Sequence, residues 1–254
     1  MTGLSSAPLV WALMLGLGAV VGSFLNVCIH RLPRRESLVL PGSRCPHCTA
    51  PIRWHDNIPL LSFLLLGGRC RACKGPISWR YPLVEAITVV LFVLAWVRFG
   101  PTLEGLRAIA LVSALLVVTG IDLDHRIIPD RITLPGIAFG LASAWFLPPG
   151  IISSAVGTVV GGGLFYLIAL VSRGGMGGGD IKLAAMLGAF LGWQAGLLAI
   201  FFGVLAGGVV GVVLLVLRLR GRKDAIPFGP FLAFGGVVAL FWAAPILRWY
   251  LLQR

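Results

Sequence analysis

Two aspartates stand where apolar segments meet polar sequence, and their type and position suggest catalysis. Asp122 directly follows an apolar run, whereas Asp180 follows three glycines (177–179) and precedes the apolar run 183–193. A charged side chain at membrane depth costs roughly 2.5–3.5 kcal/mol on insertion scales, so such a residue is a functional candidate. The alternative interpretation of Asp180 is that it only caps a helix beginning at Ile181.

Two carboxylates that lie close together cannot both ionise at low cost, so one of them keeps a proton. The ionised member then takes a proton from water as the water attacks a peptide carbonyl, and the protonated member supports the oxyanion, as in an aspartic protease. The sequence lacks the G-x-S-x-G motif of serine hydrolases and the H-E-x-x-H motif of zinc proteases. An acid pair is therefore the chemistry that the sequence favours.

Asp122 is the first of three acids in its segment and the one nearest to the apolar run. Asp124 lies two residues further on and would face elsewhere on a helix. Asp130 follows a proline and precedes an apolar segment, which favours the role of a helix cap. His125 is interpreted as a solvated interfacial residue rather than a base. Lys182 is expected either to lower the pKa of a nearby acid or to bind a substrate carbonyl. The alternative is that it simply extends to the membrane interface.

Four of the five cysteines form two C-x-x-C pairs separated by 21 residues, namely Cys45 with Cys48 and Cys70 with Cys73. This spacing predicts a tetrahedral zinc site, with redox thiols as the alternative. The pairs lie in a basic loop that is assigned below to the cytoplasm, where thiols stay reduced. Because four thiolates leave no open coordination position, the zinc is expected to be structural. Cys28 fits a small apolar residue inside a membrane span.

The composition indicates which class of protein holds these residues. Of the 254 residues, 58% are hydrophobic and only 12% are charged, and apolar runs of about 17 residues or more recur, long enough to cross a membrane. The sequence predicts an all-α polytopic membrane protein with about eight transmembrane helices and a small cytoplasmic domain that binds zinc through the four paired cysteines. No internal repeat is evident. The expected spans are residues 8–28, 83–97, 106–121, 132–147, 151–171, a short segment ending near 193, 197–217 and 231–247.

The charges in the loops indicate the orientation. With eight spans, all but four of the 21 lysines and arginines fall on one side of the membrane, which the positive-inside rule assigns to the cytoplasm. Asp122 and Asp180 both lie on that side, and both termini lie outside. The first apolar segment is interpreted as a retained span rather than a signal peptide, because no basic residue precedes it and no cleavage site follows it. The net charge of +12 therefore reflects topology, and no nucleic-acid partner is expected.

Three domains are expected from this pattern. They are a first transmembrane helix at residues 1–29, a tetracysteine domain at 30–82 and a membrane peptidase domain at 83–254.

Further motifs extend over nearly the whole chain, and their order is specific. They are Gly22-Ser23-Phe24-Leu25-Asn26-Val27, His30-Arg31-Leu32-Pro33, the paired cysteines, Asn57-Ile58-Pro59, Arg80-Tyr81-Pro82-Leu83-Val84-Glu85, Ile121-Asp122-x-Asp124, Pro129-Asp130, Gly177-x-Gly179-Asp180-x-Lys182-Leu183 and Ile226-Pro227-Phe228-Gly229-Pro230. In these motifs the chain resembles the type 4 prepilin peptidases, the bifunctional leader peptidase/N-methyltransferases among the GxGD-type membrane aspartic proteases.

The resemblance implies that Asp122 and Asp180 are the catalytic acids. It implies a multi-pass protein of the bacterial inner membrane, surrounded by lipid, that cuts the short basic leader of prepilin or pseudopilin precursors after a glycine at the cytoplasmic face. It also implies methylation of the new N-terminal residue with S-adenosylmethionine as cofactor. The sequence does not place the binding site of this cofactor; the cytoplasmic loop and Glu85 are candidates, and Glu85 could instead simply pair with Arg80.

Two other classes of function use the same residues. The chain could be an ion-coupled transporter in which Asp122 and Asp180 bind protons or cations, which predicts ion flux and no proteolysis. The absence of a repeated half counts against this interpretation. A peptide-binding subunit without chemistry would leave two costly interfacial acids without a purpose.

Overall fold

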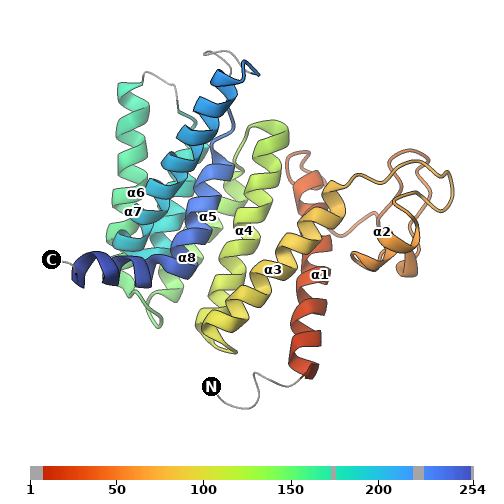
Figure 1. Cartoon of the computed structure of the whole chain (residues 1–254), viewed down its shortest axis with the longest axis horizontal. Coiled ribbons are helices and arrows are strands. Elements are labelled where there is room, and N and C mark those ends of the chain that lie inside the picture. Colours follow the sequence, from red (N-terminus) through yellow and green to blue (C-terminus); the bar gives the residue numbers. More distant parts are fainter. Residues whose placement is uncertain (1–7, 173–175, 220–225, 253–254) are drawn as a thin grey trace. The chain divides into compact units, whose positions relative to one another are not determined.

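A computed structural model describes residues 8–172, 176–219 and 226–252. The residues outside these ranges include most of the basic loop expected between the last two spans. The described helices are α1 (Pro8–Arg31), the 3-10 helix η1 (Trp54–Asp56), α2 (Leu61–Leu65), α3 (Arg80–Phe99), α4 (Leu103–His125), α5 (Asp130–Ser143), α6 (Ile151–Val171), α7 (Gly178–Val216) and α8 (Gly229–Leu252), as Figure 1 shows. The described residues form no β-strand beyond two isolated bridges. The all-α class is confirmed.

Six of the described helices are long and apolar enough to cross a membrane, namely α1, α3, α4, α6, α7 and α8. The other expected spans are also helical, but their form differs from the expectation. The fourth span is α5, which has only 14 residues and so a length of about 21 Å, against roughly 30 Å for a hydrocarbon core. The sixth and seventh spans are joined in α7, which is assigned as one helix of 39 residues. The polytopic architecture is confirmed, with these differences.

A break at Gly192 divides α7 into two segments, 178–191 and 193–216. Gly192 has φ 76° and ψ 179°, a backbone conformation that glycine adopts far more readily than other residues. The two segments fold back sharply, since a Cβ atom on Gly196 would lie only 3.2 Å from the Cα atom of Gly188. Eight residues of straight helix would span about 12 Å. The first segment therefore ends inside the protein and is as short as α5.

The chain forms two compact units, Met1–Gly105 and Leu106–Arg254. In the first unit α1 packs against α3, and the side-chain amide of Asn26 donates a hydrogen bond to the Tyr81 carbonyl at 3.1 Å. The tetracysteine segment connects these two helices. In the second unit α7 packs against α5, α6 and α8.

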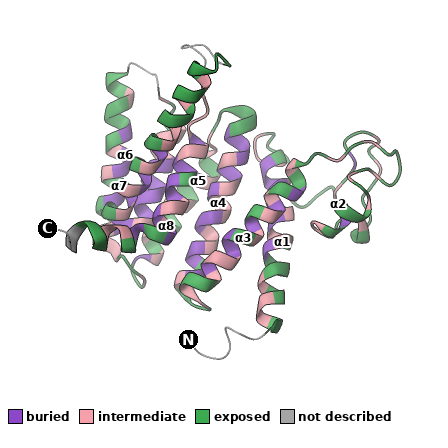
Figure 2. Cartoon of the chain, in the orientation of Figure 1, coloured by how far each residue is buried: buried purple, intermediate pink, exposed green. Residues whose placement is uncertain are grey.

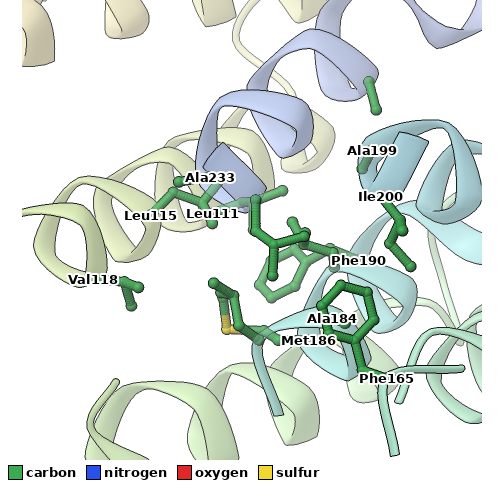
Figure 3. Close-up of a cluster of buried hydrophobic side chains, with 14 of the residues drawn as sticks. Leu111, Leu115, Val118, Phe165, Ala184, Met186, Phe190, Ala199, Ile200 and Ala233 are labelled. Atoms are coloured by element: carbon green, nitrogen blue, oxygen red, sulfur yellow. The ribbon is translucent and has the colours of Figure 1, made fainter. Parts of the chain in front are cut away.

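The apolar core of the second unit draws on four of its helices. Figure 2 shows the buried positions along these helices, and Figure 3 shows the core side chains themselves. The core members include Leu111, Leu115 and Val118 of α4, Phe165 of α6, Ala184, Met186, Phe190, Ala199 and Ile200 of α7, and Ala233 of α8. Helices α6 and α7 approach so closely that a Cβ atom on Gly188 would collide with the Gly157 carbonyl. Small residues permit such contact between helices in a membrane, where packing replaces the hydrophobic effect as the driving force.

Arg107 lies inside this unit, at the second residue of the expected span 106–121. The side chain is only 6% exposed. It donates hydrogen bonds to the carbonyls of Phe190 at 2.6 Å, Ala189 at 3.1 Å and Pro148 at 2.5 Å. The first two carbonyls belong to the last turn before the break at Gly192, where helical partners are missing. Arg107 therefore caps the first segment of α7.

Candidate active site

Asp122 lies in the last turns of α4 and is only 5% exposed. Its Oδ2 atom accepts a hydrogen bond at 2.8 Å from the backbone N–H of Gly229, the first residue of α8. A Cβ atom on Gly229 would lie 2.7 Å from the same oxygen, so only glycine can bring its N–H this close. This contact explains part of the I-P-F-G-P motif, whose role the sequence did not indicate.

Asp180 is the third residue of α7, which begins at Gly178 with Gly177 as its N-cap. The alternative in which Asp180 caps a helix beginning at Ile181 is therefore wrong, because the helix begins three residues earlier. The half-buried carboxylate of Asp180 accepts a hydrogen bond from the backbone N–H of Gly177, which is the reach-back contact of a capping box. A carboxylate has about four acceptor positions, so this contact leaves Asp180 able to bind water or substrate as well.

The structure brings the two aspartates together at one end of the second unit. Gly179 packs against Ile128 in the loop after α4, where a Cβ atom on the glycine would lie 2.7 Å from the Cβ of Ile128. Asp122 and Asp180 are near enough to interact electrostatically. The ends of α4, α7 and α8 thus converge on two acids, as the assignment of both to one membrane face predicts.

The remaining candidates of this region lie at its rim. Lys182 Nζ contacts Asp130 Oδ1 at 2.6 Å, and the two side chains are 38% and 54% exposed. Asp130 is the first residue of α5, and the N-cap is Pro129 without a side-chain hydrogen bond, so the prediction of Asp130 as the cap is wrong by one residue. The pair instead joins the starts of α5 and α7. Asp124 and His125 are exposed.

The four paired cysteines come together in the first unit, and their Sγ atoms all lie within 4.8 Å of one another. The Sγ atoms of Cys45 and Cys73 are 3.8 Å apart. A tetrahedral site with Zn–S bonds of about 2.3 Å places its sulfur atoms about 3.8 Å from one another. The cluster therefore fits a zinc ion.

A short repeat that was missed in the sequence builds this cluster. The pattern R-C-x-x-C-x-x-P-I-x-W occurs at 44–54 and again at 69–79. In each copy the N–H of the first cysteine bonds to the carbonyl five residues later, at 3.0 and 2.8 Å, and an isolated bridge joins the ends of the turn. Backbone hydrogen bonds from Cys48 and His47 lower the pKa of Cys45 to about 7. The two turns thus bring their four sulfur atoms together.

Two acids stabilise the tetracysteine segment, one from within it and one from α3. Asp56 forms a two-pronged ion pair with Arg71, with Nε–Oδ2 at 2.9 Å and Nη2–Oδ1 at 2.7 Å, and this arginine lowers the pKa of Asp56. Glu85 is buried in α3 and accepts a hydrogen bond from the Leu60 N–H at 2.8 Å. The Ser23 side chain also hydrogen-bonds the Glu85 carboxyl group. Glu85 therefore ties the loop before α2 to the pair of helices α1 and α3.

Comparison with known proteins agrees with these two units. Residues 17–99 match the family described as Bacterial Peptidase A24 N-terminal domain, and residues 109–212 match the Type IV leader peptidase family. No solved structure matches the chain.

Three curated relatives share the name prepilin leader peptidase/N-methyltransferase. The protein of Aeromonas hydrophila is 41% identical over 96% of this chain and 94% of its own length. The protein of Pseudomonas aeruginosa is 41% identical over 98% of this chain and 96% of its own length. The protein of Myxococcus xanthus is 46% identical over 82% of this chain and 64% of its own length. Identity of this extent over nearly the full length confirms what the motifs indicated: the chain belongs to the type IV leader peptidase family.

Proposed function

We propose that the chain is a prepilin leader peptidase in which Asp122 and Asp180 form an aspartic-protease pair at the cytoplasmic face of the inner membrane. The observation that carries the proposal is the convergence of the two acids at one end of the second unit, each held by a backbone N–H group. The names of the relatives support the reaction. In this proposal the membrane peptidase domain is residues 83–254, and both termini lie outside.

In the proposed reaction one aspartate is ionised and the other carries the shared proton. The ionised carboxylate takes a proton from water while the water oxygen bonds to the scissile carbonyl carbon. The protonated acid donates its hydrogen to the carbonyl oxygen. The first aspartate then passes the proton taken from water to the amine nitrogen as the C–N bond breaks, and the second acid recovers its proton from a hydroxyl group of the intermediate. The N–H groups of Gly229 and Gly177 fix the two carboxylates, so little reorganisation is needed during the reaction.

The surroundings of Asp180 suit an extended peptide at the membrane surface. Gly177 and Gly178 are exposed, and without side chains they leave backbone uncovered beside the carboxylate. A prepilin has a basic leader followed by an apolar helix, so its scissile bond would lie at the same interface as the two acids.

We also propose that the chain methylates the new N-terminal amine, because the relatives bear the name N-methyltransferase as well. When bound, S-adenosylmethionine would supply the methyl group for this amine. We propose no residue for this second site. The cysteines Cys45, Cys48, Cys70 and Cys73 would hold a structural zinc ion that stabilises the tetracysteine domain.

The test replaces each acid by its amide, Asp122→Asn and Asp180→Asn, with Asp124→Asn as a control on the same turn of α4. Each of the first two changes should lower prepilin cleavage by at least about 10²–10⁴-fold, the contribution of a positioned acid or base, whereas the control should cleave normally. Cleavage is read from the mass of the product's N-terminus after incubation in proteoliposomes. Wild-type cleavage by either amide variant excludes that residue as catalytic.

The same proteoliposomes test the transporter alternative. When a proton or cation gradient is applied across the proteoliposome membrane, the wild-type protein should carry no coupled ion flux. Flux that is lost in both amide variants, in a protein that cuts no prepilin, would overturn the proposed function.

A further inference from the structure

The short helix α2, Leu61–Leu65, has its polar face inward and its apolar face outward. Ser62 is the buried residue of this helix; its hydroxyl accepts a hydrogen bond from the Ile58 N–H at 3.0 Å and donates one to the His55 carbonyl at 3.0 Å. Leu64 and Leu65 are 72% and 76% exposed, and Figure 2 shows this helix largely as exposed. A helix facing water has the opposite pattern. This pattern fits an apolar environment better than water.

Two contacts fix the height of α2 along α3, which is one of the candidate membrane spans. The residue before α2, Leu60, donates its N–H to Glu85, which lies in the second turn of α3. The Phe63 ring packs edge-on against Trp79, the N-cap of α3, with ring centroids 4.7 Å apart. Helix α2 consequently lies where α3 enters the bilayer.

The charges and aromatic residues around α2 match those of a membrane interface. Residues 30–82 hold nine lysines and arginines but only two acids, Glu36 and Asp56, and Asp56 is already paired with Arg71. Trp79 is 76% exposed beside α2. Exposed tryptophan with leucine and basic residues is the signature of segments that bind the headgroup region of anionic lipids. The same positive charge disfavours a basic leader peptide as the occupant.

We propose that α2 is an interfacial anchor. Its apolar patch, defined as Leu61, Leu64, Leu65 and Trp79, inserts into the lipid leaflet at the boundary between headgroups and acyl chains. The surrounding basic residues bind anionic headgroups. The tetracysteine domain is thereby held flat against the membrane rather than projecting into the cytoplasm.

The test places the photo-crosslinking residue p-benzoylphenylalanine at Leu65, and separately at Thr49, an exposed control position in the first cysteine turn. The full-length protein is reconstituted in nanodiscs of phosphatidylcholine with or without phosphatidylglycerol and irradiated, and adducts are identified by mass spectrometry. Lipid adducts should form several-fold more often at position 65 than at position 49. In mixed bilayers, phosphatidylglycerol should make up a larger fraction of the lipid adducts at position 65 than of the bilayer itself.

Three results would overturn the proposal. Equal lipid labelling at both positions would show no specific insertion. Adducts at position 65 to the chain itself, or to a second copy, would show that protein covers the patch. Helical circular dichroism equal to that of the wild-type protein verifies that each labelled variant is folded, so the absence of lipid adducts from a folded variant also counts against the anchor.

Discussion

Replacing Arg107 by methionine should destabilise the second unit more than any other exchange of a single arginine for a side chain of similar length. The guanidinium group caps carbonyls of Ala189 and Phe190 at the break in α7 and also bonds to the Pro148 carbonyl. Methionine fills similar space but donates no hydrogen bond. Three carbonyls would then lose a partner, and two of them belong to the buried residues Ala189 and Phe190.

The magnitude follows from the number of bonds lost. Hydrogen bonds to a charged group contribute about 1.5–3 kcal/mol in soluble proteins, whereas polar contacts in a membrane protein average about 0.6 kcal/mol. Removal of a buried charge also returns part of its desolvation cost. Three bonds at intermediate strength therefore predict a loss of about 2–4 kcal/mol, or roughly 30- to 1,000-fold in the unfolding equilibrium. Arg107→Lys should lose less, because it keeps the charge and up to three donors.

The loss can be measured by unfolding the purified protein with sodium dodecyl sulfate in mixed micelles and following helical circular dichroism. The control is Arg98→Met. Arg98 is exposed, and its guanidinium carbon lies 5.7 Å from the centre of the Phe99 ring. This control should lose at most about 1 kcal/mol. If Arg107→Met is no less stable than Arg98→Met, the capping role assigned to Arg107 is wrong.

Three further changes test other parts of the structure. Cys45→Ser should reduce bound zinc from about one equivalent to less than half under reducing conditions, measured by elemental analysis, while Cys28→Ala should not; a wild-type protein without zinc would refute the four-cysteine zinc site. Gly188→Ala should destabilise the α6–α7 contact by about 1–3 kcal/mol through overpacking, whereas Gly163→Ala, where a Cβ atom meets open space, should be neutral or stabilising; equal effects would contradict the close packing. Asp56→Asn should weaken protection of the tetracysteine domain against hydrogen exchange near neutral pH. Arg71 lowers the folded-state pKa of Asp56. The stability that the ion pair contributes is therefore complete above the unfolded pKa of about 3.9 and is lost as the pH falls below that value. A difference in protection between Asp56→Asn and wild type that persists in strong acid would exclude this ion pair as the cause.

The positions of the two candidate acids could be predicted because they depend on features that are local in the sequence. Apolar runs and the charges between them predict that Asp122 and Asp180 share one side, and the structure brings these two acids together. The cysteine spacing is likewise local, and it led to the cluster that the structure contains. The short repeat around the cysteines was equally visible in the sequence and was missed.

Features that depend on distant partners could not be predicted. Arg107 stands near the end of an apolar run, which is typical of an interfacial arginine, and its carbonyl partners lie 41 to 83 residues away. Gly192 is one of 34 glycines in the chain, and nothing in the sequence distinguishes the one that breaks a helix. The role of Gly229 likewise depends on its hydrogen bond to Asp122, which lies 107 residues away in the sequence.

The two short helices, α5 and the first segment of α7, explain why these distant contacts occur together. Neither is long enough to cross a hydrocarbon core, so each must end inside the protein, where its terminal carbonyls need donors. At one end the pair is joined by Lys182 and Asp130, beside the candidate acids. At the other end Arg107 reaches the Gly140 carbonyl of α5 at 3.5 Å as well as the last carbonyls of the α7 segment. One buried arginine therefore caps the α7 segment and also reaches α5, while the opposite ends of both helices lie beside the candidate acids.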